Sequence, residues 1–150
     1  FNVNREVFMD YPNYILNEIN KGIKMGMDSI STVSEKVQDD SFKEDLRFQY
    51  SKYNEILNKV NTELQKYGSF PEEVNPAQKA MGWAQIQWDT MNDKSNSNIA
   101  KMLIKGTNMG IIEGVTLLNQ HPEADNDIKD ILKEFIKFQE NNVERLKQYL

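Results

Sequence analysis

Apolar residues recur along this chain at alternating spacings of three and four, which is the period of an α-helix and not of a β-strand. In the first such stretch, Leu16, Ile19, Ile23 and Ile30 fall on one stripe. The pattern appears in five stretches, at about residues 12–37, 42–67, 76–92, 96–120 and 126–150. The sequence therefore predicts an all-α fold.

Local signals mark where several of these helices begin and end. Ser41 and Glu44 have the spacing of a capping box, in which each side chain satisfies a free amide group at the helix start. Gly68 is placed to end the second helix, because glycine adopts the left-handed conformation that terminates helices. Asn75 and Pro76 suit the N-cap and first position of the third helix.

The helical region after Pro76 is too long to be one helix of this domain. Continuous to Gln120 it would span about 67 Å at 1.5 Å per residue. The polar run Asn92–Asn98 favours a break there. The chain then has four long helices, and one short helix lies between the second and the third of them. That order predicts a ferritin-like four-helix bundle with a short crossover helix between the second and third bundle helices. The alternative is that residues 76–92 protrude as an extension of a kinked third helix.

Composition excludes several classes of protein. The chain has 150 residues, no cysteine and a net charge of -5, so it is the size of one domain and has no disulfides or thiolate metal sites. Its positive charges are interspersed with negative ones, which argues against nucleic acid as a partner. The longest apolar runs are too short for a membrane span or a signal peptide. We expect a cytoplasmic protein, although the sequence begins at Phe1 without an initiator Met.

Three segments resemble a known group of proteins: Met25–Ile30, Ile99–Ile111 and Val143–Leu150. They are similar to a family of small ferritin-like four-helix bundles from spore-forming, low-GC Gram-positive bacteria. The resemblance covers most of the chain from about Asn20 onward. It implies a ferritin-like fold and a bacterial cytoplasmic setting, but it brings no reaction and no catalytic residues.

The sequence lacks the ligands of a di-iron ferritin. Such sites use glutamates and two Glu-x-x-His pairs that face the bundle core. The single histidine, His121, lies at a helix end and is expected to act as a polar cap. Where the pairs are expected, the chain has Gln49 with Lys52 and Gln139 with Asn142. Amide oxygens are poor iron ligands, so we predict no metal, no cofactor and no catalytic residue.

The same amides suggest a buried polar network. Extending the apolar stripe of the helix at 96–120 places Glu113 inward, where a carboxylate needs hydrogen-bond partners. Gln49, Gln139, Asn142 and Tyr53 are candidate partners. The favoured interpretation is a network that fixes the register of the helices. The alternatives are an unusual ion or ligand site, and a Glu113 that faces solvent.

Five glycines recur in two of the predicted helices. Each costs a helix about 1 kcal/mol relative to alanine, so a repeated pattern needs a reason. They are Gly22 and Gly26 in the first helix and Gly106, Gly110 and Gly114 in the fourth. We favour close packing between these two helices within the bundle. A seam between two subunits is the alternative.

The short helix at 76–92 is apolar on two faces. One carries Ala77, Ala80, Ala84 and Trp88, while Trp83 falls on another, so we expect one face on the bundle and one on a second subunit. Phosphate-loop, nucleophile-elbow and zinc motifs are missing. We therefore expect a non-enzymatic helical interaction or structural module that binds itself, as a homodimer, or another helical protein. The alternative is a metal- or small-molecule-binding bundle built around Glu113.

Overall fold

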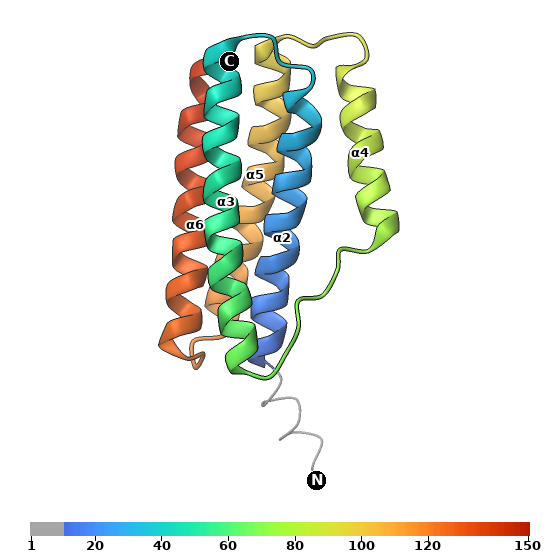
Figure 1. Cartoon of the computed structure of the whole chain (residues 1–150). Helices are drawn as coiled ribbons and strands as arrows, with labels where there is room; N and C mark the ends of the chain where they lie inside the picture. The colour runs from blue at the N-terminus through green and yellow to red at the C-terminus, as the bar shows by residue number, and fades with distance from the viewer. Residues whose placement is uncertain (1–10) are drawn as a thin grey trace.

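A computed structural model describes residues 11–150 of the chain (Figure 1). The described part is helical, and its element order follows the predicted one. The five α-helices are α2 (Tyr11–Ser34), α3 (Asp40–Lys66), α4 (Pro76–Thr90), α5 (Asn96–Gln120) and α6 (Asn126–Leu146). A short 3-10 turn, η1 (Lys147–Tyr149), follows α6. The first helix thus ends three residues before Val37, which is nevertheless buried.

The four long helices lie side by side as a bundle, with α4 on the crossover between α3 and α5 (Figure 1). This confirms the ferritin-like connectivity predicted from the sequence. The alternative of a kinked, protruding third helix is wrong, because α4 lies beside α2 and runs parallel to it. Two contacts fix that direction: Lys79 lies 3.5 Å from Asp28, and Lys36 donates to Gln87 at 2.8 Å.

The core of the bundle is apolar and draws on all four long helices. Among its fully buried side chains are Ile19 of α2, Leu46 of α3, Ile99 of α5 and Leu132 of α6. Burying a side chain of this size stabilises a fold by about 1.5–3 kcal/mol. The apolar stripes predicted from the sequence therefore form the core, and their packing holds the four helices together.

Helix ends follow the sequence signals in two cases out of three. Gly68 has a φ of 66°, and the amide of Ser69 donates to the Leu64 carbonyl at 2.9 Å, as expected for a helix end at glycine. The Asn75 side chain caps α4. The capping box at Ser41 is wrong, because Asp39 caps α3 by accepting from the Phe42 amide at 2.7 Å.

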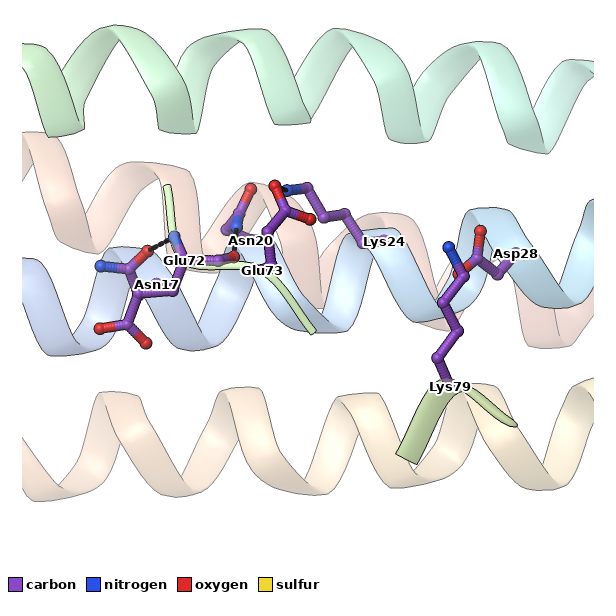
Figure 2. A network of polar contacts seen from close by, with 7 residues as sticks. All are labelled: Asn17, Asn20, Lys24, Asp28, Glu72, Glu73 and Lys79. Atoms are coloured by element: carbon purple, nitrogen blue, oxygen red, sulfur yellow. Dashed lines mark hydrogen bonds and ion pairs between the residues drawn. The ribbon is translucent and has the colours of Figure 1, made fainter. Parts of the chain in front are cut away.

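Two asparagines of α2 hold the crossover to the bundle (Figure 2). Asn17 accepts a hydrogen bond from the amide of Glu72 at 2.8 Å, and Asn20 donates to the carbonyl of the same residue at 2.9 Å. Both asparagines are buried. Because they lie three positions apart on one face of α2, they bind both main-chain groups of one extended residue. We call this pair of bonds the asparagine clamp.

Beyond the clamp, the crossover is attached mainly by exposed polar contacts (Figure 2). Lys24 pairs with Glu73 at 3.3 Å on the surface of α2. In α4 itself only Thr90 is buried, and Ile86 is half-buried. The helix therefore rests on the bundle through a narrow strip and leaves most of its side chains exposed.

The opposite side of the bundle, where α3 meets α6, is closed by charged pairs. Arg145 binds Asp45 at 2.8 Å, and Lys59 binds Glu134 at 2.8 Å. Within residues 11–150, no helix combines the length and the apolar character needed to cross a lipid bilayer.

Candidate functional site

Four residues, one from each long helix, meet near the middle of the bundle. The hydroxyl of Tyr53 on α3 donates to the Oε1 atom of Gln139 on α6 at 2.7 Å, and both side chains are buried. Gly26 of α2 lies against the Tyr53 ring, and Gly110 of α5 lies against the Gln139 amide nitrogen. We call Gly26, Tyr53, Gly110 and Gln139 the mid-bundle layer.

The two glycines of the layer make room for the two polar side chains. A Cβ atom at Gly26 would lie 2.6 Å from a carbon of the Tyr53 ring. At Gly110 it would lie 2.5 Å from Nε2 of Gln139. Both distances are far below ordinary van der Waals contact. A side chain at Gly26 would therefore push against the rigid ring of Tyr53, and one at Gly110 would shift the flexible end of Gln139.

The layer is electrically neutral. Burial raises the pKa of Tyr53, and the neighbouring polar side chains of Gln139 and Asn142 offset only part of that effect. The phenol therefore keeps its proton at physiological pH. Its ring also packs edge-on against Phe138, with the ring centres 4.7 Å apart.

Gln49 and Asn142 extend this polar region along the α3–α6 contact. Two cross-helix pairs, Tyr53 with Gln139 and Asp45 with Arg145, show that α3 and α6 run antiparallel and place Gln49 level with Asn142. Both amides are buried. Within the described chain, Nε2 of Gln49 and Nδ2 of Asn142 have no hydrogen-bond partner. Four of the five residues predicted for a polar network are thus buried along the α3–α6 contact, where Tyr53 and Gln139 are joined by a hydrogen bond.

Glu113, the fifth residue, does not join them. The structure places it on the exposed side of α5, so the prediction that it points inward is wrong. The buried stripe of α5 passes from Leu103 to Gly114 and Leu117. The step after Gly110 is therefore four residues and not three, and Gly114 takes the inward place.

The glycines receive side chains from α3 and α6, and they do not bring the backbones of α2 and α5 together. A Cβ at Gly114 would lie 2.8 Å from Ile136 of α6, and one at Gly22 would lie 3.5 Å from Phe135. Gly106 has open space around it. Close packing between α2 and α5 is therefore wrong as the reason for this glycine pattern.

Because several lining residues are glycines without side chains, a groove with a volume of about 300 Å³ lies between α2 and α5. Its residues include Glu18 and Gly22 of α2, Glu113 and Gly114 of α5, and Leu132 and Phe135 of α6. We call it the α2–α5 groove. Its lining is apolar at Leu132 and Phe135, and it carries two carboxylates.

His121 is the C-cap residue of α5, as the sequence predicts, and its amide bonds to the Leu117 carbonyl. Its ring lies near Tyr11 and Tyr14, with both ring-centre distances at 6.3 Å. No group of three or more His, Asp or Glu residues suited to a metal ion occurs in the described residues 11–150.

A ferritin-like fold implies a di-iron centre between the four helices, but the residues present here do not fit one. The inward positions of the mid-bundle layer hold two glycines, a neutral phenol and a carboxamide. The unpartnered atoms of Gln49 and Asn142 are NH₂ groups, which donate hydrogen bonds and cannot bind a cation. The layer therefore has no anionic donor for iron.

Sequence reasoning missed the asparagine clamp and the α2–α5 groove. Asn17 and Asn20 were detectable, because two asparagines interrupt the most apolar stretch of α2 on its inward side. Buried asparagines in a helix usually have a partner outside that helix. The groove gave no comparable signal, since its shape depends on which neighbouring side chains fill the space beside each glycine.

Comparison with known proteins supports the fold. The structure is similar to that of the bacterioferritin-related protein from Bacteroides fragilis, described as a dodecameric thioferritin. The match covers 92% of this chain and 84% of that one, with a TM-score of 0.69 and 10% sequence identity. No protein-family model and no curated protein matches the sequence. The chain is therefore a ferritin-like helical bundle, and its membership of a low-GC Gram-positive family stays a prediction.

Proposed function

We propose that this protein acts by binding protein, as a ferritin-like interaction module, and not by oxidising or storing iron. The observation that carries the proposal is the mid-bundle layer. Tyr53 and Gln139 occupy the bundle centre as a hydrogen-bonded neutral pair, and Gly26 and Gly110 are shaped to hold that pair. In this bundle, packed neutral side chains occupy the central positions where a di-iron protein has its metal ligands.

The surface of α4 supports the binding half of the proposal. Trp83 and Trp88 are 58% and 72% exposed, and Met81 and Met91 are 71% and 59% exposed. Tryptophan and methionine are enriched in protein interfaces, whereas charged residues are depleted from interface cores. The α4 helix has only two charged residues, Lys79 and Asp89. This composition favours a second copy of the chain or another helical protein as its partner.

Iron chemistry gives the direct test. Purified protein is titrated anaerobically with Fe(II), exposed to air, and compared with buffer and with an active ferritin. We expect Fe(II) to oxidise at the buffer rate and native mass spectrometry to detect no stoichiometric iron. The variant Glu113→Gln is the matched control for ions held loosely at the exposed groove carboxylate. Stoichiometric iron that persists in Glu113→Gln, or accelerated oxidation, would overturn the proposal.

A further inference from the structure

The crossover helix covers only half of the α2–α5 side of the bundle (Figure 1). Lys79, near the start of α4, lies beside Asp28, and Gln87, near its end, bonds to Lys36. The covered half is therefore the one near the end of α2. The other half, formed by α2 residues 11–25 and the facing part of α5, contains the α2–α5 groove. It is not covered by α4, although the extended segment at Glu72 and Glu73 lies along α2 beside the groove.

The half that α4 leaves free has the same length as α4. The α4 helix has 15 residues and is about 22 Å long at 1.5 Å per residue. Residues 11–25 of α2 span about the same length by the same rise. One side of the molecule thus carries a protruding helix and, beyond it, a recessed surface of matching length.

The recessed half exposes apolar side chains around the groove. Met109 and Ile112 of α5 are 63% and 65% exposed, and Tyr14 of α2 is 54% exposed. The small residues Gly22 and Gly114 leave room between the helices for a third one. An alanine- and glycine-bearing helix such as α4 is suited to approach such a surface closely.

The charges of the α2–α5 groove and of α4 are also complementary. None of the described residues that line the groove is Lys or Arg, whereas Glu18 and Glu113 are carboxylates. Glu18 lies 3.5 Å from Lys21, but Glu113 takes part in no ion pair within residues 11–150. The single cation of α4, Lys79, lies 3.5 Å from Asp28 of its own copy, but its side chain is 63% exposed and so remains accessible to a carboxylate of a partner.

The exposed apolar area suits a stable dimer. Enclosing an aromatic side chain buries about 150–250 Å², so Trp83 and Trp88 together offer roughly 200–300 Å² at their observed exposures. Met81 and Met91, with the apolar rim of the groove, add to this area. A standard interface buries about 800 Å² per partner, of which roughly 450 Å² is apolar. The exposed apolar area that one copy offers on these surfaces is of the same order as the apolar area of a standard interface.

We propose that two copies of this chain associate about a two-fold axis, with α4 of each copy seated in the α2–α5 groove of the other. A two-fold axis at the boundary between the covered and recessed halves brings each protrusion onto the other copy's recess. The inference rests on the proposed interaction function, and it names the partner and both contact surfaces.

Substitutions on the two surfaces test the interface. We expect Trp88→Glu on α4 and Ile112→Glu at the groove each to raise the dimer dissociation constant by about 30-fold or more, the size of a hot-spot loss. Tyr50→Glu, at an exposed aromatic residue of α3, is the matched control and leaves association unchanged. Analytical ultracentrifugation measures association, and circular dichroism checks that each variant is folded.

Charge reversal and cross-linking test the pairing itself. Lys79→Glu, which also breaks the pair with Asp28 of its own copy, and Glu113→Lys should each weaken the dimer. The two reversals combined in one chain should restore part of the loss, and that restoration reports on the contact between copies. Because the chain has no cysteine, single cysteines can be introduced without background. Mixing Ala80→Cys with Ile112→Cys should give an intermolecular disulfide under oxidation, whereas Ala80→Cys with Lys137→Cys on α6 should not.

The outcomes separate this inference from the proposed function. A protein that is monomeric from micromolar to millimolar concentration and free of iron overturns the dimer and leaves α4 to a different partner. An oligomer that is unaffected by both Trp88→Glu and Ile112→Glu also overturns it, because another surface then forms the contact. Stoichiometric iron that persists in Glu113→Gln, or accelerated iron oxidation, overturns the proposed function, whatever the oligomeric state.

Discussion

The helices α6 and α5 are neighbours in the same bundle, yet their surfaces differ. The 25-residue α5 has three charged residues: Lys101, Lys105 and Glu113. The 21-residue α6 has nine, which are Asp127, Lys129, Asp130, Lys133, Glu134, Lys137, Glu140, Glu144 and Arg145. Large apolar side chains are exposed on α5, but on none of the described positions of α6.

The difference shows that the two sides of the bundle are covered to different extents. We call the α3–α6 side the finished side and the α2–α5 side the open side. On the α3–α6 side, buried apolar side chains meet a rim of ion pairs such as Arg145 with Asp45. On the α2–α5 side, glycines leave a groove and α4 covers only part of the surface. A side whose apolar surface remains uncovered is suited to recognition, whereas the finished side contributes mainly stability.

The largest expected effect contrasts a core residue with one on α4. Leu46→Ala leaves a cavity on the finished side and should lower the free energy of unfolding by about 2–5 kcal/mol. Trp88→Ala, in dilute protein where self-association contributes least, should change it by no more than about 0.5 kcal/mol. Urea denaturation measures both. Equal losses would show that α4 is part of the stabilising core and would remove the distinction.

The second prediction contrasts two glycines. Gly26→Ala brings a Cβ atom against the rigid ring of Tyr53 and should destabilise the fold by about 1–3 kcal/mol. Gly106→Ala meets no neighbour within 4 Å and should stabilise it by about 0.5–1 kcal/mol through helix propensity. Thermal and urea unfolding of both variants check the signs. A stabilising Gly26→Ala would contradict the mid-bundle layer.

The third prediction concerns alkaline pH. Because burial raises the pKa of Tyr53, the unfolded chain ionises first as pH rises above about 10, and the native state loses stability until its own pKa is reached. One such group contributes a slope of about 1.4 kcal/mol per pH unit. We expect Tyr53→Phe to remove that part of the slope in urea unfolding above pH 10. Tyr50→Phe is the control, and an unchanged slope in Tyr53→Phe would argue against the buried phenol.

The smallest effect concerns the asparagine clamp. Asn20→Ala removes one hydrogen bond to Glu72 and should lower stability by about 0.5–1.5 kcal/mol. Amide hydrogen exchange in residues 69–90 should accelerate, while that of α6 should not. Lys24→Ala removes only an exposed ion pair and should stay within about 0.5 kcal/mol. If α6 exchanges faster as well, the crossover is not a separate unit.

Most of the fold could be predicted from the sequence, because it depends on local patterns. The helix break was readable from the polar run after α4, and α5 has the predicted bounds of Asn96 and Gln120. The failure at Ser41 is also local, since Asp39 is an equally good cap two residues earlier. Such choices depend on how the preceding loop enters the helix.

The candidate site was only partly predictable. Tyr53, Gln49, Gln139 and Asn142 were found because they interrupt apolar stripes, and such interruptions are visible in a sequence. Glu113 was misplaced by one position, since a heptad drifts by about 20° from a straight helix and the error accumulates along α5. The role of Gly110 was not readable either, because it depends on where a side chain of α6 lies.

The asparagine clamp recognises main-chain atoms alone, and this has a consequence for protein engineering. Asn17 and Asn20 engage the amide and carbonyl of Glu72 and leave its side chain outside the interaction. An extended segment of different sequence can therefore be grafted there, with proline excluded at position 72 because it has no amide hydrogen. The crossover becomes an exchangeable segment whose attachment point is encoded in α2. Its exposed positions can carry a new epitope or reporter, provided that the ion pairs of Glu72 and Glu73 with α2 and the buried side chain of Val74 are kept or replaced.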